Sequence, residues 1–459
     1  MQTNPPDIII IGAGLTGLTL AYYLKKAGKN VLVLEKQSRA GGVIHSIAEN
    51  GFIYETGPST GVLGSVEIAE LFEELNTKCI LEIADKSAQK RYILKNGKWT
   101  ALPSGLTSAI STPLFTWRDK FRILGEPLRK KGNQPDESLA DLVRRRLGKS
   151  YLDYAVDPFI SGVYAGNPEK LITRFALPKL YQLEQNYGSF IRGAIKKKKE
   201  PKAPNAEKAT RKVFSVKGGL SGLIQALTDN IGDENIIYNC RDIQILREET
   251  LFQLTFFTEN SEKQELSTSK VITTVGGYTL LELLPFIPQT LMEPIKNTVY
   301  ADVVQAAVGF NLWEGKLLDG FGGLVPGKEN REMLGILYPS AIFKSRTPEG
   351  GALLSVFMGG SRQPEIFTKT DKEIEEIILK EVRSTLGEEL TPDFIRIHRH
   401  KNAIAQYDVS TKERLEAIQD IEKKYPGLYV AGSMRDGIGM ADRVKQAKQL
   451  ADKIIDIYK

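Results

Sequence analysis

The sequence predicts an α/β protein with more than one core, in which a parallel sheet is assembled from both ends of the chain. A buried strand, a glycine turn and a helix are expected near the start, and the same order returns near the end. The chain of 459 residues exceeds what one core usually holds, so two or three lobes are expected.

The first of these units begins at residues 8–17, "IIIIGAGLTG". The uninterrupted β-branched run suits a strand that is buried on both faces. Gly12, Gly14 and Gly17 fit the pattern G-x-G-x-x-G and lead into an apolar helix at residues 18–27. In this pattern the first glycine makes a tight turn, the second lets a pyrophosphate approach, and the third lets helix and strand pack closely. We interpret the unit as Rossmann-like and dinucleotide-binding.

A second strand is predicted at residues 31–34, and Glu35 follows it directly. An acidic residue at this place accepts hydrogen bonds from a ribose. A solvated strand end is the simpler alternative, but the order of strand, turn, helix and acid favours the ribose. The neighbouring Lys36 is included among the predicted cofactor-binding residues.

Arg39, Gly41 and Gly42 come next, and Gly57 lies in a further turn, "GFIYETGPS". A cationic side chain here can reach the pyrophosphate, and the glycine pair permits a second close approach of the backbone. These residues resemble the flavin-dependent amine oxidase and protoporphyrinogen oxidase superfamily, whose FAD fingerprint continues into R-x-G-G. An NAD enzyme would not need this element, so the resemblance implies FAD.

The C-terminal stretch "GLYVAGSMRDGIGMADRVKQAKQLADKII" predicts a strand at residues 428–431, a glycine turn and a helix. It resembles the closing FAD motif of the superfamily, with matching positions at Gly432, Asp436, Gly439 and Met440. A helix N-terminus beside the flavin would stabilise negative charge on the reduced ring. An ordinary terminal strand–helix unit is the alternative.

A third piece of the FAD domain is expected at residues 213–227, as a strand, a glycine turn and a helix. The resemblance implies that this region adds a strand to the FAD sheet. It also implies that backbone near Val213 and Val216 contacts the adenine. A buried strand ending in a glycine turn is expected at residues 270–277.

The predicted organisation is therefore discontinuous. The FAD domain takes residues 1–60, 205–277 and 424–459, and a substrate-binding domain with a mixed sheet takes 61–94 and 278–423. A helical insertion at 95–204 has a predicted helix start at Asp136 and runs into a lysine-rich linker, residues 196–212, which we expect to be a mobile loop.

Within the insertion, residues 107–131 interleave large apolar side chains with lysines and arginines. Such a segment can bind an anionic membrane surface, although basic solvated helices packed on a core look the same. We expect a cytoplasmic protein, and peripheral attachment to the cytoplasmic membrane stays open. The polar start of the chain is not typical of a signal peptide, and no apolar run approaches the length of a transmembrane helix.

Composition further limits the kinds of site and reaction that the protein can have. Cys79 and Cys240 are far apart and predict buried apolar residues rather than a disulfide or a metal site. His398 and His400 should share one face of a strand as a surface pair, and His45 is expected to be a polar loop residue. A net charge of +6 gives no reason to expect a nucleic-acid partner. No hydrolase motif is present, so the cofactor must carry the chemistry.

Three stretches resemble the protoporphyrinogen oxidase branch: "KRYILKNGKWTALPSGL", "DPFISGVYAGNPEKLITRFALPKL" and "HRHKNAIAQYDV". The resemblance implies that Arg91 pairs with a propionate and that the Gly162 carbonyl faces the tetrapyrrole nitrogens. A surface arginine and a plain turn glycine are the alternatives. Amine oxidases with covalent flavin carry a cysteine near the C-terminal motif, and this chain has none after Cys240, so FAD should be non-covalent.

The resemblance implies oxidation of protoporphyrinogen IX to protoporphyrin IX in tetrapyrrole biosynthesis, with loss of six electrons and six protons. O2 is the expected acceptor and H2O2 the product, although another acceptor and a homodimer stay open. One alternative is a sibling enzyme acting on coproporphyrinogen III. Another is a non-catalytic binder with the fold of GDP dissociation inhibitors, against which the retained Glu35 and Arg39 argue. Candidates for the clamp on the tetrapyrrole, by location alone, are Leu317, Phe321, Leu324 and Leu337.

Overall fold

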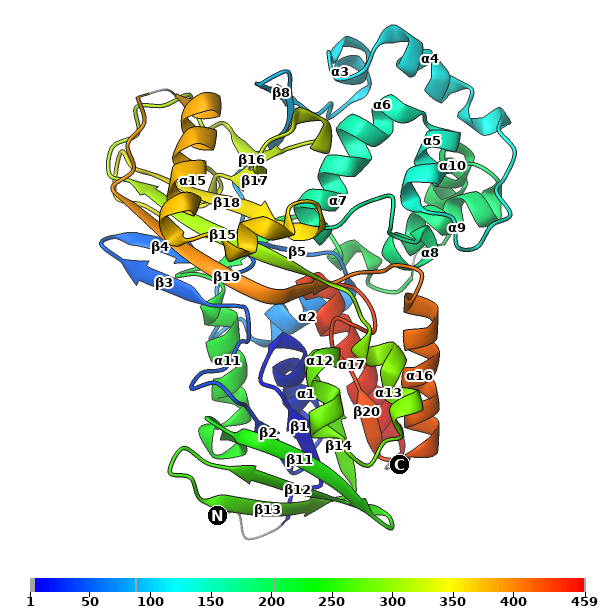
Figure 1. The fold of residues 1–459 in the computed structure, drawn as a ribbon, viewed down its shortest axis with the longest axis vertical. Coiled ribbons are helices and arrows are strands. Elements are labelled where there is room, and N and C mark those ends of the chain that lie inside the picture. The colour runs from blue at the N-terminus through cyan, green and yellow to red at the C-terminus, as the bar shows by residue number, and fades with distance from the viewer. Residues whose placement is uncertain (1–4, 87–88, 202, 388, 458–459) are drawn as a thin grey trace.

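The computed structural model describes residues 5–86, 89–201, 203–387 and 389–457. Figure 1 shows a lower lobe that holds both ends of the described chain and an upper part with a large sheet on one side and helices on the other. The predicted α/β class is confirmed.

A five-stranded parallel sheet forms the centre of the lower lobe, in the order β10-β2-β1-β14-β20. Its strands are β10 (Ile236–Ile237), β2 (Val31–Leu34), β1 (Ile8–Ile11), β14 (Lys270–Thr273) and β20 (Leu428–Val430). Because β1 is central, every one of its side chains is buried. The sheet therefore joins segments from the start, the middle and the end of the chain, as predicted.

Two layers cover this sheet. On one face pack the helices α1 (Leu15–Lys26), α2 (Val66–Glu74), α11 (Ser221–Ile231) and α17 (Met440–Ile457). On the other face lie the antiparallel strands β11 (Arg241–Glu248), β12 (Leu251–Phe257) and β13 (Lys263–Thr268), with the helices α12 (Gly277–Leu283), α13 (Gln289–Lys296) and α16 (Thr411–Lys424). Ile8 and Ile10 face the first layer, and Ile9 and Ile11 face the second.

The upper sheet has seven strands in the order β19-β15-β18-β17-β16-β7-β8. They are β19 (Phe394–Ala405), β15 (Tyr300–Phe310), β18 (Ala352–Gly359), β17 (Met333–Leu337), β16 (Gly320–Leu324), β7 (Lys90–Lys95) and β8 (Lys98–Ala101). The helix α15 (Asp371–Leu386) packs its apolar side on one face, and α14 (Pro339–Ile342) lies beside β18 and β16. Only β16 and β7 pair in parallel, which makes this the mixed sheet that was expected.

Two small sheets connect the lobes. The hairpin of β3 (Ser46–Glu49) and β4 (Phe52–Glu55) is antiparallel, and the second sheet orders β5 (Gly61–Val62), β9 (Val213–Val216) and β6 (Leu81–Ile83) as β5-β9-β6. The strand predicted at 213–216 therefore forms, but in this sheet. The strand that this region adds to the parallel sheet is β10 instead.

The helical unit runs from residue 106 to residue 199. It contains α3 (Leu106–Ser111), α4 (Trp117–Leu124), α5 (Leu139–Arg146), α6 (Lys149–Tyr151), a π-helical turn (Leu152–Val156), α7 (Asp157–Tyr164), α8 (Thr173–Ala176), α9 (Pro178–Tyr187) and α10 (Phe190–Lys199). A fully buried ion pair between Arg146 and Glu126 ties the segment after α4 to α5. The expected N-cap at Asp136 is wrong, because the Ser138 hydroxyl caps α5 and Asp136 pairs with Arg174.

Two further expectations differ from the structure. The first lysines of the expected mobile loop extend α10, and Lys208 beyond them pairs with Glu73 of α2 at 2.6 Å.

In addition, α2, α12, α13 and α16 pack in the lower lobe, although we expected them in the substrate domain from their positions in the sequence. Their apolar faces match the lower sheet, which sequence order alone does not reveal. We therefore propose a lower lobe of residues 5–86, 205–299 and 406–457.

Candidate functional site

Three loops converge at the carboxyl ends of β1, β2 and β20: the glycine turn (residues 12–17), the arginine loop (39–45) and the C-terminal turn (431–439). Ligands of open parallel sheets bind at this edge. The Thr274 hydroxyl donates to the carbonyls of Ile11 and Gly12 at 3.0 and 3.1 Å, and a Cβ on Gly432 would lie 3.1 Å from the Thr274 carbonyl oxygen. Thr274 therefore joins the first motif to the last.

The three glycines of the first motif have different reasons to be glycine. Gly12 has a φ of +102°, and a Cβ there would lie 2.8 Å from the Thr274 hydroxyl. A Cβ on Gly17 would lie 2.0 Å from the Gly12 carbonyl, so Gly17 allows helix and strand to touch. Gly14 has ordinary extended angles, φ −72° and ψ 175°, and nothing lies within 4 Å of the position its Cβ would take.

The surroundings of Gly14 are the space that a pyrophosphate would fill. Gly14 is the N-cap residue of α1 and makes no side-chain cap, so the first amides of the helix point outward without a capping side chain. Such a helix start binds phosphate through its N–H groups and its dipole. Gly42 adjoins it, since a Cβ on Gly42 would lie 3.5 Å from the Gly14 Cα. The residues present thus fit a dinucleotide.

Glu35 is buried and braces the glycine turn. Its carboxylate accepts hydrogen bonds from the amides of Ala13, at 2.7 Å, and Gln37, at 2.9 Å. Each carboxylate oxygen keeps further acceptor capacity, which suits ribose hydroxyls. Lys36 next to it is exposed. The segment beside Glu35 is residues 237–240, since the Cys240 amide donates to the Glu35 carbonyl at 2.9 Å.

The position of residues 237–240 beside Glu35 changes which residues are expected to contact the adenine. Val213 and Val216 lie in the β5-β9-β6 sheet and not beside β2, so their position gives no support to that role. Residues 237–240 occupy the expected place, and the sequence signal for them was the apolar pair of β10 followed by a polar turn.

The Arg39 side chain stabilises the arginine loop by hydrogen bonds to carbonyls of the same loop. Its guanidinium donates to the carbonyls of Ala40, Gly42 and Ile44, at 3.1, 2.9 and 3.3 Å. In this conformation it shapes the loop instead of standing free for a phosphate. Gly41 has a φ of +105°, and its amide donates to the Ala13 carbonyl at 2.8 Å, which holds the loop against the glycine turn.

Gly57, in the turn after β4, packs against the arginine loop. A Cβ there would lie 2.1 Å from the Val43 carbonyl oxygen, so the turn after β4 packs directly on the arginine loop. Two residues further on, Ser59 is buried, and its hydroxyl has no hydrogen-bond partner in the described part of the chain. A buried hydroxyl of this kind is typical of a site that a ligand completes.

The C-terminal turn is held by two residues that sequence reasoning missed. The Gln446 side chain accepts from the Gly432 amide at 2.8 Å and donates to Asp436 at 2.5 Å, and Arg443 donates to Asp436 at 3.0 Å. Both lie on the buried face of α17, where polar side chains are unusual, and that was the signal that could have found them.

Asp436 itself is exposed at the surface of this turn. Its side chain is 62% accessible, yet the surrounding protein removes enough water to raise the pKa of its carboxyl. Gly439 is exposed and Met440 is the first residue of α17, so this turn, like the glycine turn, ends in a helix N-terminus. The predicted FAD residues other than Val213 and Val216 thus lie on loops at one edge of the sheet.

The two predicted substrate residues lie in the upper part, on either side of β16. Arg91 is exposed on β7 and forms no ion pair within the described residues, and its guanidinium lies 5.8 Å from the centre of the Phe321 ring. Gly162 is on α7, where a Cβ would lie 2.4 Å from Leu324 Cδ2. Close packing of α7 on β16 therefore requires a glycine at this position.

The four residues proposed to clamp the tetrapyrrole do not all lie in one place. Phe321 contacts Arg91 and Leu324 contacts Gly162, whereas Leu317 is 83% exposed outside the sheet. Leu337 is half-buried on β17. On α7, Phe159 and Val163 are exposed on the same side of the helix as Gly162.

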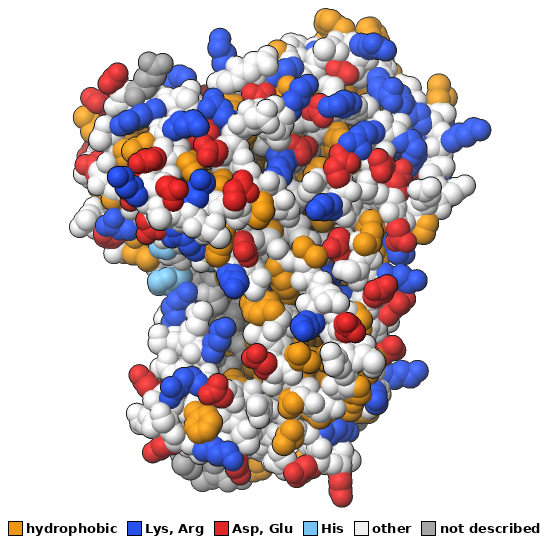
Figure 2. Space-filling view, viewed as in Figure 1, with side chains coloured by type: hydrophobic (Ala, Val, Ile, Leu, Met, Phe, Trp, Pro, Cys, Tyr) orange, Lys and Arg blue, Asp and Glu red, His pale blue; other side chains and the backbone are white. Residues whose placement is uncertain are grey.

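The three histidines of the chain gather between the lobes, and Figure 2 shows histidine at the rim of a notch there. His398 and His400 share one face of β19 as expected, but they are half-buried and not a free surface pair, since the His400 ring donates to the Thr56 carbonyl at 2.6 Å. Burial first, and then the charges of His400 and His45, lower the pKa of His398. No group of side chains in the described ranges could hold a metal ion.

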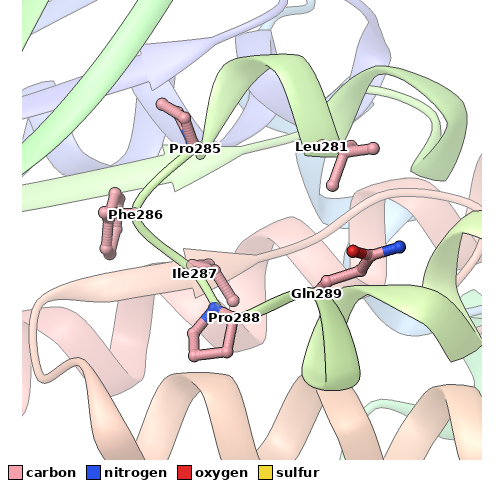
Figure 3. Close-up of a pocket in the computed structure, with 6 residues that line it drawn as sticks. All are labelled: Leu281, Pro285, Phe286, Ile287, Pro288 and Gln289. Atoms are coloured by element: carbon pink, nitrogen blue, oxygen red, sulfur yellow. The ribbon is translucent and has the colours of Figure 1, made fainter.

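A shallow hollow of about 520 Å3 lies elsewhere, between α12 and α13 (Figure 3). It is lined by Leu281, Pro285, Phe286, Ile287, Pro288 and Gln289. None of these side chains is ionisable, and none belongs to the motifs above. The hollow is therefore not the candidate site.

Comparison with known proteins agrees with this geometry. Residues 15–455 match the family described as flavin containing amine oxidoreductase. The chain is 30% identical to protoporphyrinogen oxidase 1 of Arabidopsis thaliana, over 98% of this chain and 88% of the relative. It is 24% identical to coproporphyrinogen III oxidase of Bacillus subtilis, over 98% and 97%. A crystal structure from Exiguobacterium sp. 255-15, provisionally named protoporphyrinogen oxidase, superimposes with a TM-score of 0.81 at 23% identity, covering 99% of each chain.

Proposed function

Since the chain belongs to the flavin-containing amine oxidoreductase family and is thus an FAD-dependent oxidoreductase, we propose that it oxidises protoporphyrinogen IX to protoporphyrin IX. When bound, FAD accepts the electrons of this oxidation. We propose that the FAD is non-covalent, that O2 is the final acceptor and that H2O2 is the product. The relatives that act on two porphyrinogens support this substrate class.

Arg91 is the observation that carries the proposal. Its guanidinium stands without an ion pair among the described residues, beside the Phe321 ring. Two residues along β7, on the same face, Ile93 is buried against Leu324. A free cation at the edge of an apolar face suits a flat apolar molecule that carries carboxylates, because the fork of the guanidinium matches a carboxylate.

Gly162 supports the same orientation. It lies in the last turn of α7, where the carbonyls have no intrahelical partner. Such a carbonyl can accept hydrogen bonds from pyrrole N–H groups. Phe159 and Val163, exposed beside it, would cover the ring and exclude water.

Assaying both porphyrinogens side by side tests the function. We expect the FAD-loaded protein to consume O2 with protoporphyrinogen IX, at a kcat/KM at least about tenfold higher than with coproporphyrinogen III, because two additional carboxylates need cationic partners. The opposite preference would identify the sibling enzyme. FAD-loaded protein that oxidises neither substrate would contradict the proposal, and a protein that purifies without flavin would favour the non-catalytic binder.

We also propose that the helical unit docks on an anionic membrane. Ile110, Trp117, Phe121, Leu124 and Leu128 form the α3–α4 patch, and each of these side chains is at least 49% exposed. Lysines and arginines surround the patch at the end of the molecule where α3 and α4 lie (Figure 2). Leu114 and Phe115 belong to the segment that was expected to face the membrane. Both are buried, so they pack beneath the patch and are not part of it. Of the helices described, none is long and apolar enough to cross a bilayer.

Replacing Phe121 and Leu128 together by Ser should weaken binding to anionic vesicles by about a hundredfold or more, since each buried apolar side chain contributes about 1.5–3 kcal/mol, or about 3–6 kcal/mol for the pair. Leu312 and Leu317 provide a matched control, because they are 66% and 83% exposed, as Phe121 and Leu128 are, but lie in the sheet lobe. Co-sedimentation with vesicles measures the effect. Equal binding of the two double variants, or salt-independent binding to neutral lipid, would contradict the proposal.

A further inference from the structure

Two polar side chains carry buried atoms without partners on the face of the upper sheet that meets the lower lobe. Gln305, in the middle of β15, is 1% exposed, and neither its Oε1 nor its Nε2 has a hydrogen-bond partner among the described residues. His398 lies directly opposite on β19, and its Nε2 is likewise buried and unpartnered. Buried polar atoms without partners are costly and rare, so three neighbouring ones indicate a missing ligand.

The neighbours of Gln305 define where this face lies. Val304 and Ala306 point to the opposite face and pack with α15, so Gln305 points away from that helix. On its own face, Ala307 packs against Phe52 and Tyr54 of the β3–β4 hairpin. Val303, on the other side, packs in one cluster with Ala165 at the end of α7.

Gln305 is thus placed between two parts of the candidate site. The hairpin on one side leads into the turn at Gly57, and α7 on the other side carries Gly162. His400 shares this face, and its hydrogen bond to the Thr56 carbonyl fixes β19 to the same turn at 2.6 Å. The unpartnered Ser59 hydroxyl lies three residues further along the chain. The turn that His400 holds is therefore followed closely in the chain by a further unpartnered hydroxyl.

We propose that the Gln305 carboxamide binds the nitrogen- and carbonyl-bearing edge of the flavin ring, with His398 beside it as a second polar contact. A carboxamide offers a donor and an acceptor side by side, which such a ring edge can satisfy together. Binding of FAD would then supply the partners that the protein alone lacks. This inference rests on FAD as the cofactor and not on the identity of the porphyrinogen.

Gln305→Met separates this role from a mere packing defect. Met has a similar shape without the polar atoms, so the protein freed of FAD should keep or increase its Tm. The dissociation constant for FAD should rise roughly three- to tenfold, and the visible absorption bands of the bound flavin should shift. Thr411→Val is the matched control, because Thr411 is fully buried on α16 with an unpartnered hydroxyl and lies away from this face. It should leave FAD affinity and spectrum unchanged.

An unchanged FAD affinity and spectrum in Gln305→Met would overturn the proposal. If that variant does not fold, Gln305→Glu keeps the shape and is read by the midpoint potential of the bound flavin. A carboxylate at the ring edge should lower this potential, because it disfavours the electron-rich reduced ring. A potential equal to that of the wild type would also overturn it. Both readouts are independent of porphyrinogen turnover.

Discussion

Gly14→Val should give a folded protein that carries no FAD. The backbone at residue 14 is extended, so Val is allowed there, and no protein atom lies within 4 Å of the added Cβ. The branched side chain would instead occupy the space in front of the α1 N-terminus, where we propose that the pyrophosphate binds. We expect FAD affinity to fall at least about 100-fold, which corresponds to about 2.8 kcal/mol of binding free energy.

A second glycine in the chain provides the control. Gly105 is the N-cap residue of α3, has an extended backbone with φ −157°, and also has nothing within 4 Å of its Cβ position. Gly105→Val should bind FAD like the wild type. The measurements are the flavin absorbance of the purified proteins, titration with FAD, and the Tm without FAD. Normal flavin content in Gly14→Val would show that the glycine turn does not hold the pyrophosphate.

Arg91→Ala should lower kcat/KM for protoporphyrinogen IX by roughly ten- to a hundredfold, with the flavin spectrum unchanged. The lost charge-assisted hydrogen bond is worth about 1.5–3 kcal/mol, and a substrate bound mainly by apolar contacts has few other groups that fix its orientation. Arg91→Lys should recover only part of the loss, because an ammonium replaces the fork of the guanidinium. Steady-state kinetics with the FAD-loaded variants measure both.

Lys90 is the matched control for charge. It precedes Arg91 on β7, where alternate side chains point to opposite faces, and it is already paired with Asp319. Lys90→Ala removes the same formal charge from the same strand and should leave kcat/KM within about twofold. If Arg91→Ala and Lys90→Ala behave alike, the propionate contact is wrong, whereas FAD binding and the Gly14 result would be unaffected.

The motif of the first strand and turn could be interpreted residue by residue from the sequence. A run of four isoleucines suits a strand that is buried on both faces, and the close approach at Gly17 shows that the third glycine lets helix and strand pack. The same holds for the C-terminal unit, where the strand predicted at 428–431 ends one residue earlier. Short-range patterns were sufficient to locate these turns, although Gly12 and Gly432 are also restricted by Thr274, which is distant in the sequence.

The contacts that complete the site depend on distant residues and were not predictable in this way. Gln446 holds Gly432, Thr274 joins the first and last motifs, and Arg39 turns inward to its own loop. The expected adenine contact at Val213 lost its support for the same reason, because a strand pattern does not state which sheet the strand joins.

The sequence by itself determined the α/β class and the positions of the glycine turns, which follow from local spacing of apolar residues and glycines, and its motifs carried the resemblance to the family. Only the tertiary structure decided which helices cover the lower sheet, where the three histidines meet and that Gln305 is buried without a partner. The physical reason is that burial and hydrogen-bond satisfaction are properties of the packed chain. A glutamine in an alternating strand looks solvent-facing until the opposite lobe covers that face.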